Sequence, residues 1–277
     1  MQRSNRKSVL ITGCSSGIGL AAALTMKARG WRVLASARNG EDLEMLAGHG
    51  LEAVALELRD PDSIARCAEQ VLERTDGGLY ALFNNAAYGQ PGAVEDLPVD
   101  VLREQFEVNL FSWHDLTRRL IPAMRARGEG RIVQCSSVLG LISPPYRGAY
   151  NATKFALEAL SDAMRHELAP SGIRVSLIEP GPIESRFVAH ALAALKDHID
   201  MDTSAHAETY EVRLAAMEAG GKKRFKLGPE AVAKKLVHAL ESPRPRVRYY
   251  VTLPTYFAAM SRRFLPPSIA DSMVARS

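Results

Sequence analysis

Short apolar runs alternate with longer segments of helical periodicity along most of the chain. The short runs are apolar at consecutive positions, which is typical of parallel strands that helices cover on both faces. The longer segments repeat apolar residues every three or four positions, as helices with one buried face do. The pattern predicts strands over residues 9–11, 32–37, 53–57, 79–83, 131–135, 174–178 and 248–252, and helices over residues 17–29, 62–75, 99–127, 149–169 and 229–240.

This regular alternation predicts an α/β fold, a doubly wound parallel sheet in three layers. The sequence has no internal repeat and no low-complexity linker, so we expect one domain over residues 1–277. After the sixth strand the pattern loosens into two short helices, near residues 187–195 and 207–219, and a break at 220–223. Because open α/β sheets bind ligands beyond the carboxyl ends of their strands, we predict a substrate lid over residues 183–227. Residues 253–277 form a C-terminal extension.

Composition narrows the class of protein. The chain is 47% hydrophobic and 24% charged, with a net charge of +4, which is ordinary for a globular protein. Its basic residues are spread and form no stripe with aromatic partners, so we expect no nucleic-acid binding. Three cysteines without CxxC spacing argue against a disulfide framework or a metal site. The first apolar run stops at Gly13, too early for a signal peptide, and we expect a cytoplasmic protein.

A glycine-rich turn, Thr-Gly-Cys-Ser-Ser-Gly-Ile-Gly, occupies residues 12–19 between the first predicted strand and helix. Glycines allow a tight turn, and they let backbone N–H groups reach a pyrophosphate at the positive end of the helix dipole. Such a turn alone is a weak signal, and an ordinary turn is the alternative. Its position on the first strand of a strand–helix series favours dinucleotide binding.

Two further patterns carry acid–base chemistry. Tyr150 and Lys154 lie four residues apart in a predicted helix, and therefore on one face. An ammonium group lowers the pKa of a neighbouring phenol, which makes the pair a proton donor and acceptor. Ser137 ends the fifth predicted strand, thirteen residues before Tyr150, where its hydroxyl can hold a substrate oxygen. The ordinary alternatives are a surface tyrosine–lysine pair and a capping serine.

Taken together and in this order, the motifs resemble the single-domain branch of the short-chain dehydrogenase/reductase family. TGxxxGxG, Asn-Asn-Ala at 84–86, a helix asparagine, the serine and YxxxK all occur in family order between about residues 7 and 187. The details of the glycine-rich turn and of Leu-Arg-Asp at 58–60 resemble the branch with 17β-hydroxysteroid and retinol dehydrogenases and bacterial aldehyde reductases.

The resemblance implies four catalytic residues. Tyr150 would be the acid/base, and Lys154 would lower its pKa and bind the nicotinamide ribose. Ser137 would orient the substrate carbonyl. Asn109 would anchor a water that links Lys154 to bulk solvent, although from the residue alone a kink in the helix is an equal interpretation.

The resemblance also implies the residues that hold the cofactor: Gly13, Ser15, Ser16, Gly17, Ile18, Gly19, Leu58, Asn85, Ala86, Tyr150, Lys154, Pro180, Gly181 and Ile183. One position departs from the family pattern, because Ala87 replaces the glycine of the family's Asn-Asn-Ala-Gly. If that position needs a positive φ, alanine is strained, and we expect a local adjustment without loss of the cofactor.

The end of the second predicted strand bears on which dinucleotide binds. Folds specific for NAD usually place an acid there for the ribose 2′-hydroxyl. Here no acid occurs before Glu41, and Arg38 can pair with a 2′-phosphate, with Ser16 adding a hydroxyl. The alternative is that Arg38 is a surface residue in a turn. The sequence favours NADP(H) over NAD(H).

These residues predict an oxidoreductase that transfers a hydride between NADP(H) and a small-molecule carbonyl or alcohol. The residues expected around the substrate are mostly apolar and indicate a lipophilic aldehyde, ketone, steroid or retinoid: Leu139, Leu141, Ile142, Tyr146, Phe187 and residues 189–195. The alternatives are a non-catalytic NADP(H)-binding regulator and a redox-neutral epimerase or dehydratase on the same fold.

The C-terminal extension has an apolar helical stripe of Tyr256, Phe257, Met260 and Phe264 beside two arginines. We expect it to pack on the lid or on a neighbouring subunit, with a peripheral membrane contact as the alternative. The family resemblance implies a homodimer or homotetramer formed through the helices at 99–127 and 149–169.

Overall fold

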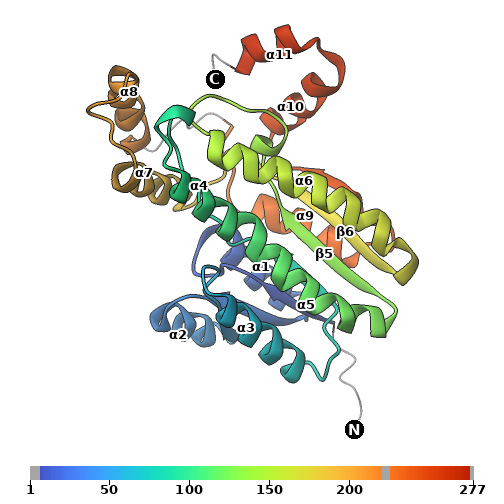
Figure 1. The fold of residues 1–277 in the computed structure, drawn as a ribbon. Coiled ribbons are helices and arrows are strands. Elements are labelled where there is room, and N and C mark those ends of the chain that lie inside the picture. The colour runs from blue at the N-terminus through green and yellow to red at the C-terminus, as the bar shows by residue number, and fades with distance from the viewer. Residues whose placement is uncertain (1–6, 220–224, 275–277) are drawn as a thin grey trace.

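The computed structural model describes residues 7–219 and 225–274. At its centre is a parallel sheet of seven strands in the order β3-β2-β1-β4-β5-β6-β7 (Figure 1). The strands are β1 (Ser8–Ile11), β2 (Arg32–Ala37), β3 (Glu52–Ala55), β4 (Ala81–Asn84), β5 (Gly130–Cys135), β6 (Ile173–Glu179) and β7 (Arg248–Tyr250). The predicted doubly wound fold is confirmed, and the strand order reverses between β1 and β4, where such sheets bind ligands.

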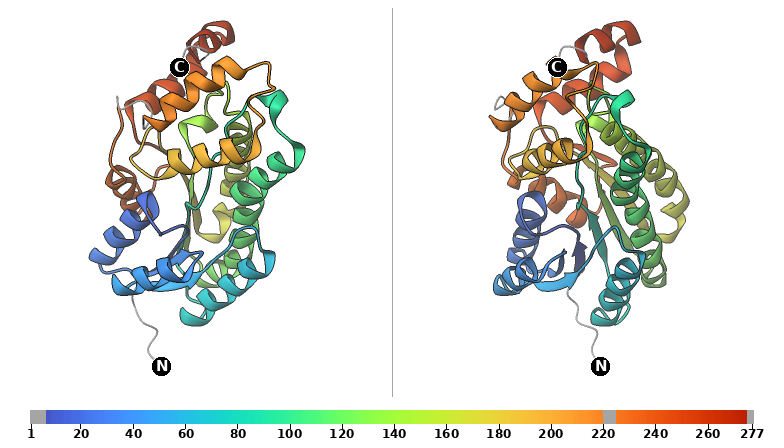
Figure 2. Two further views of the ribbon diagram at one scale, coloured as in Figure 1. Left: turned by 90° about the vertical axis from the view of Figure 1, so that its left-hand side faces the viewer. Right: turned by 60° about the vertical axis from the view of Figure 1, so that its left-hand side comes forward.

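Helices cover both faces of the sheet. They are α1 (Gly17–Ala28), α2 (Gly40–Gly48), α3 (Pro61–Arg74), α4 (Val99–Phe106), α5 (Ser112–Arg127), α6 (Gly148–Leu168), α7 (Phe187–His198), α8 (Ala207–Glu218), α9 (Glu230–Glu241), α10 (Leu253–Phe264) and α11 (Pro267–Val274). On one face α1 packs against α9, and on the other α3 packs against α5, with α6 beside it (Figure 2). The sheet is therefore the middle of three layers.

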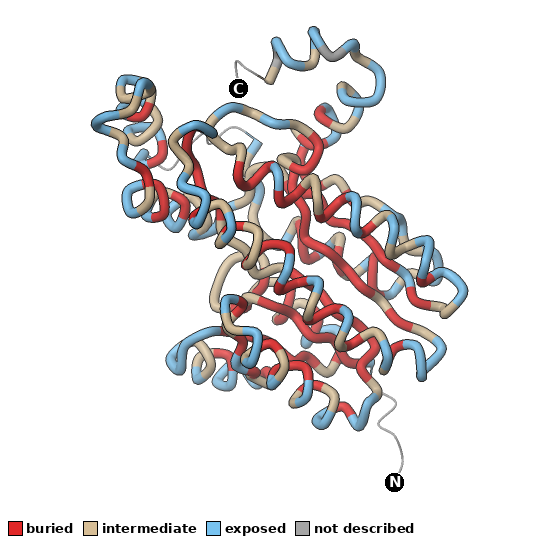
Figure 3. Tube along the Cα trace, in the orientation of Figure 1, coloured by how far each residue is buried: buried red, intermediate tan, exposed pale blue. Residues whose placement is uncertain are grey.

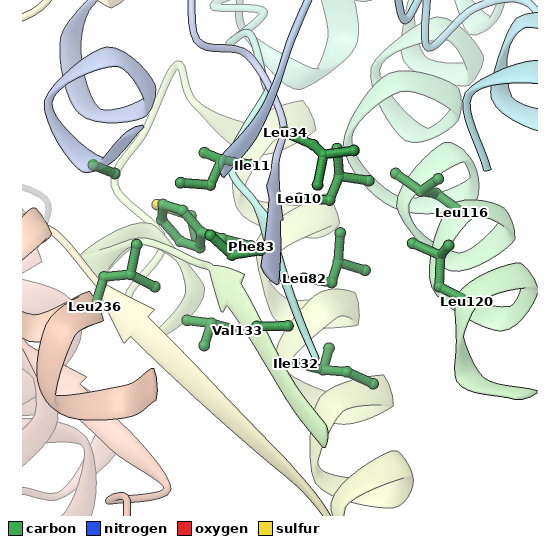
Figure 4. Packing of buried hydrophobic residues seen from close by; sticks show 14 of the residues in the cluster. Leu10, Ile11, Leu34, Leu82, Phe83, Leu116, Leu120, Ile132, Val133 and Leu236 are labelled. Atoms are coloured by element: carbon green, nitrogen blue, oxygen red, sulfur yellow. The ribbon is translucent and has the colours of Figure 1, made fainter. Parts of the chain in front are cut away.

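The core forms because the strands are buried at consecutive positions, as their apolar sequences predict (Figure 3). All four residues of β1 and of β4 are buried. Leu116 and Leu120 of α5 cover one face of the sheet, and Leu236 of α9 covers the other (Figure 4). Burying each such leucine stabilises the fold by about 1.5–3 kcal/mol.

Helix α2 was not predicted. Its N-terminus is well specified, because the Asn39 side chain accepts a hydrogen bond of 2.8 Å from the backbone N–H of Asp42, and Glu41 lies in the first turn. Its only buried residue is Leu46. A helix that buries one side chain has no apolar repeat, so periodicity gives no signal for it.

The helix predicted over 99–127 is interrupted by a π-helical turn, Glu107–Phe111, between α4 and α5. Asn109 lies at the centre of this turn, fully buried. The hydroxyl of Ser112 donates a hydrogen bond of 2.8 Å to the carbonyl oxygen of Val108. The interpretation of Asn109 as the site of a helix irregularity is confirmed, and such turns are frequent at functional sites.

The two helices predicted after the sixth strand are present as α7 and α8, beyond the carboxyl edge of the sheet (Figure 1). They pack against each other over a small apolar cluster that includes Ala191, Leu195 and Tyr210. Ile183 and Leu227 form an isolated bridge, so the two ends of the predicted lid meet. The break predicted at 220–223 lies outside the described residues.

The apolar stripe of α10 is exposed: Phe264 is 66% exposed, and Tyr256, Phe257 and Met260 also face outward. The expected packing of this stripe on the lid is therefore wrong, because α10 buries Thr255 and Ala258 instead. A contact with another subunit or with a membrane surface stays a prediction. None of the described helices is both long and apolar enough to cross a membrane.

Candidate active site

A cavity of about 1050 Å³ lies at the carboxyl edge of the sheet, between the strand ends and the lid helices. Most of the predicted site residues line it: Gly13, Ser15, Ser16, Gly17, Ile18, Arg38, Leu58, Asn85, Ala86, Ser137, Tyr150, Lys154, Pro180, Gly181 and Ile183. Gly19 and Asn109 are buried and do not line it. Residues from seven separate segments of the chain therefore converge on one space.

The glycine-rich turn forms a cradle without side chains. Gly13 and Gly17 have φ angles of 70° and 55°, in the left-handed region that favours glycine. A β-carbon on Gly13 would lie 2.8 Å from Cα of Ala86, and one on Gly19 would collide with the carbonyl oxygen of Gly13. Helix α1 begins here with free backbone N–H groups, so the cradle fits the pyrophosphate of a dinucleotide.

Thr12 and Asn85 fix this cradle to the next strand. The Thr12 hydroxyl oxygen accepts hydrogen bonds from the backbone N–H groups of Asn85 (2.8 Å) and Ala86 (3.0 Å). The Asn85 amide donates to the carbonyl oxygen of Thr12 at 3.0 Å. Ala87 has no positive φ, so the departure from the family pattern causes no backbone strain there.

Lys154 is a buried cation with few partners. It is 1% exposed, its Nζ donates a hydrogen bond of 2.8 Å to the carbonyl oxygen of Cys135, and it lies 4.3 Å from the ring centroid of Trp113. Burial lowers the pKa of Lys154 to about 8. An ammonium group has three donors, and among the described residues only the carbonyl oxygen of Cys135 accepts a hydrogen bond from it, which fits a further acceptor such as a ribose hydroxyl.

Tyr150 is also buried, and burial raises its pKa well above that of a free tyrosine. A hydrogen bond with Ser137 and the charge of Arg147 only partly offset this effect. Loss of hydration therefore outweighs the neighbouring charges in the chain itself, and the expectation that Lys154 lowers the pKa of Tyr150 stays a prediction. Tyr150 is held in its protonated form, the form that donates a proton.

Ser137 and Asn109 both have structural partners. The Ser137 oxygen accepts a hydrogen bond of 3.1 Å from the backbone N–H of Leu139, so the capping interpretation is confirmed. A hydroxyl that accepts can still donate, and Ser137 lines the cavity. The Asn109 side chain accepts a hydrogen bond from the N–H of Tyr88 (3.2 Å) and donates one to its carbonyl oxygen (2.8 Å), which holds the loop after β4 against the π-helical turn. The proposed water link to Lys154 stays a prediction.

The end of β2 is electropositive. Arg38 is exposed, lines the cavity and forms no ion pair with any described residue. Arg186 also lines it and donates a hydrogen bond of 3.1 Å to the carbonyl oxygen of Ser15. Burial and the charges of Arg186 and Arg38 lower the pKa of His190. Sequence reasoning missed Arg186 and assigned His190 only to the substrate side, within residues 189–195, because nothing in their own segment marks them as neighbours of β2.

The substrate side of the cavity differs from the prediction in two places. Leu141 and Ile142 do not line it, because they follow the short helical turn Val138–Gly140, against which α10 packs on the outside. Phe187 does line it, with its ring centroid 5.4 Å from that of Tyr150. Lining residues that the sequence did not predict come from the loop after β4, from the start of α6 and from the lid: Gly89, Gln90, Arg147, His198, Tyr210 and Arg213. The described residues contain no cluster of metal-ligating side chains.

A family model described as short chain dehydrogenase matches residues 7–196. The protein belongs to this family. The matched segment contains the glycine-rich turn, Ser137, Tyr150 and Lys154, so the resemblance drawn from the motifs is confirmed.

Among curated relatives of this short-chain dehydrogenase, the uncharacterized oxidoreductase YbbO of Escherichia coli K12 is 46% identical over 97% of this chain and 94% of its own length. The human 17-beta-hydroxysteroid dehydrogenase type 1 is 34% identical over 94% of this chain and 79% of its own. The NADPH-dependent 3-dehydrocapnine reductase of Ornithobacterium rhinotracheale is 30% identical over 95% and 94%.

Two solved structures are also similar. A short-chain dehydrogenase from Streptomyces avermitilis has a TM-score of 0.80 and 30% identity, over 98% of this chain and 95% of its own. A variant of actinorhodin polyketide ketoreductase solved with NADPH has a TM-score of 0.72 and 27% identity, over 89% and 96%. The family and the oxidoreductase class therefore apply to this chain.

Proposed function

We propose that this protein transfers a hydride between NADP(H) and the carbonyl or alcohol carbon of a small molecule. The observation that carries the proposal is the convergence of Ser137, Tyr150 and Lys154 on the cavity that also contains the glycine cradle. The hydroxyls and the ammonium supply proton chemistry at one end, and the cradle and helix N-terminus supply an anion site at the other.

The choice of NADP(H) rests on the charges at the end of β2. Arg38 has no acidic partner among the described residues, and Arg186 lies on the same cavity. Ser16 precedes α1 without capping it, which leaves its hydroxyl free to bind a phosphate. Guanidinium groups bind phosphate bidentately. One similar enzyme is named as NADPH-dependent and one similar structure contains NADPH, which supports this choice.

In the proposed mechanism, the hydroxyls of Ser137 and Tyr150 donate hydrogen bonds to the substrate carbonyl oxygen and fix its orientation. Tyr150 then protonates that oxygen, and the Lys154 ammonium stabilises the phenolate that remains. NADPH, when bound, supplies the hydride. The hydroxyl of Tyr150 suits the role of acid in carbonyl reduction, which is the proposed direction.

Purified protein should be mixed with NADPH, and in parallel with NADH, and a panel of aldehydes, ketones, ketosteroids and retinal, with cofactor absorbance followed over time. We expect turnover with NADPH and at least one carbonyl compound, and much slower turnover with NADH. NADPH binding without turnover across the panel would favour a regulator. Conversion of a substrate without net loss of NADPH would favour an epimerase or dehydratase.

A further inference from the structure

Two arginines lie together on the substrate side of the cavity. Arg147 directly precedes α6 and is three residues before Tyr150, and Arg213 belongs to lid helix α8. Both line the cavity and both are partly buried. Arg147 directly follows Tyr146, and the Arg213 guanidinium lies 4.1 Å from the Tyr146 ring centroid, so the two cations are neighbours. In keeping with this, burial and the charge of Arg213 lower the pKa of Arg147.

Neither guanidinium forms an ion pair with any described residue. Two acids close to the lid helix α8 have other partners. Glu95 contacts Nε2 of His206 at 2.6 Å, and Asp96 accepts hydrogen bonds of 2.7 Å from the hydroxyls of Tyr210 and Ser204. Two adjacent cations without an anion between them cost free energy unless a ligand supplies the negative charge.

The surrounding residues hold these cations toward the cavity. The Arg213 guanidinium lies 4.1 Å from the ring centroid of Tyr146, which fixes its position. The Tyr146 hydroxyl is 2.9 Å from Nδ1 of His206, and its ring packs edge-on against Tyr210. Tyr146 also has a φ of 63°, a strained conformation for an aromatic residue, and the Gly92 N–H donates to its carbonyl oxygen at 3.2 Å. Strain of this kind persists where the surrounding structure imposes it, commonly at ligand sites.

The cavity wall that α7 supplies beside the catalytic residues is mostly apolar. Phe187 lies beside Tyr150, and Ala191, Ala194 and Leu195 of α7 continue the wall. Asp197 and His198 lie on the same helix, with Nδ1 of His198 2.8 Å from the amide oxygen of Gln90. A ligand that spans this space needs a carbonyl group at Tyr150, an apolar body along α7 and an anionic group at the arginines.

We propose that Arg147 and Arg213 bind a substrate carboxylate, and that the preferred substrates are oxo acids with an apolar chain between the carbonyl and the carboxylate. This rests on the proposed function for its chemistry at Tyr150. It refines the sequence-based expectation of a purely lipophilic substrate. A carboxylate accepts paired hydrogen bonds from guanidinium groups, which suits this site better than a neutral end group.

The binding step can be tested without turnover. Calorimetry should compare decanoate with decanol on the wild-type protein, on Arg213→Gln and on Arg147→Gln, with Arg125→Gln as a matched control because Arg125 is an exposed arginine away from the cavity. We expect the wild-type protein to bind decanoate roughly ten- to a hundredfold more tightly than decanol. We expect Arg213→Gln and Arg147→Gln each to remove most of that preference. Equal binding of the two probes by the wild-type protein would overturn the proposal.

The substrate preference can be tested separately with NADPH as reductant. We expect kcat/KM for 6-oxohexanoate and 10-oxodecanoate to exceed that for their methyl esters by roughly tenfold or more, mainly through KM. Arg213→Gln should bring the acid-to-ester ratio close to one, and Arg125→Gln should leave it unchanged. An acid-to-ester ratio of kcat/KM that Arg213→Gln leaves unchanged would overturn the proposal. Absence of turnover with any carbonyl compound, together with selective decanoate binding, would count against the reductase and not against the carboxylate site.

Discussion

Two buried charged regions of α6 and its neighbours make an instructive contrast. Lys154 forms no ion pair with a described residue, and its ammonium contacts a backbone carbonyl and a tryptophan ring. One turn further along the same helix, Glu158 belongs to a cluster in which Arg248 lies 3.0 Å from Glu158, 2.8 Å from Asp162 and 3.2 Å from Glu179.

The two regions differ in whether the chain supplies an ion-pair partner for the buried charge. The carboxylates of the cluster have a cation within the chain, because Arg248 of β7 lies within ion-pair distance of Glu158 and Asp162 on α6 and of Glu179 on β6, and so joins three elements. Burial and repulsion from Glu158 raise the pKa of Glu179 to about 9, so one carboxyl is held protonated at neutral pH. Lys154 has only polar neutral and aromatic partners and faces the cavity. A buried charge that has an ion-pair partner in the chain indicates a structural role. A buried charge that has no such partner and lies beside a cavity indicates a ligand-binding role.

The largest effect should come from the catalytic region. Tyr150→Phe removes the proton donor and keeps the ring that packs on Phe187. We expect turnover to fall by about a thousandfold or more, because general acid catalysis contributes on the order of 10²–10⁴ and the Ser137 contact alone cannot protonate the product. Steady-state kinetics and a fluorescence titration with NADPH check this. Substantial turnover by the variant, with the fold intact by circular dichroism, would refute the assignment of Tyr150.

The contrast predicts opposite effects on stability for the two cations. Arg248→Met leaves buried carboxylates without their partner and should destabilise the fold by about 3 kcal/mol. Lys154→Met removes a buried charge that has no counterion and should stabilise the chain by about 1–3 kcal/mol while abolishing activity. Urea denaturation of both variants and the wild type measures this. Destabilisation of similar size in both would remove the distinction drawn between the two regions.

The pH dependence of stability should also differ in sign. The folded-state pKa of Glu179, about 9, lies above its ordinary 4.5, so its contribution to stability is complete below about pH 4.5 and is lost as pH rises to about 9. The folded-state pKa of Lys154, about 8, lies below its ordinary 10.5, so the unfolded chain keeps that proton longer and stability rises from about pH 8 to 10.5.

Glu179→Gln isolates the first of these effects. We expect the wild type to lose about 1–2 kcal/mol relative to this variant between pH 5 and pH 9, since the coupled carboxyls share the titration. Denaturation curves at several pH values for both proteins give the difference directly. A difference that is flat with pH would show that Glu179 does not titrate in the folded protein.

Much of the fold and of the cofactor side could be predicted from the sequence because local pattern determines both. β2 spans residues 32–37 as predicted, because consecutive apolar residues indicate a strand that is buried on both faces of the sheet. The positive φ angles of Gly13 and Gly17 follow from a tight turn whose backbone lies too close to Ala86 for a side chain on Gly13. Residues whose role depends on the local backbone conformation can therefore be recognised from the sequence immediately around them.

The substrate side could not be predicted in the same way, because its residues meet only through the fold. Arg147 and Arg213 are 66 positions apart and lie in segments with no shared motif. Leu141 was wrongly assigned to the pocket since a short helical turn redirects the chain after Ser137. The effect of burial on the pKa of Tyr150 likewise depends on the whole surrounding structure.

The smallest of these effects concerns Arg38, an exposed cation without a partner among the described residues. Because water still hydrates this guanidinium, its contribution to phosphate binding should be weaker than that of a buried charge. We expect Arg38→Ser to raise KM for NADPH by roughly tenfold, to change KM for NADH little and to leave kcat nearly unchanged. Kinetics with both cofactors at two salt concentrations, with Arg125→Ser as control, test this. The NADPH effect should shrink at high salt, and an equal loss of NADH affinity would mean that Arg38 supports the cavity wall instead of recognising the 2′-phosphate.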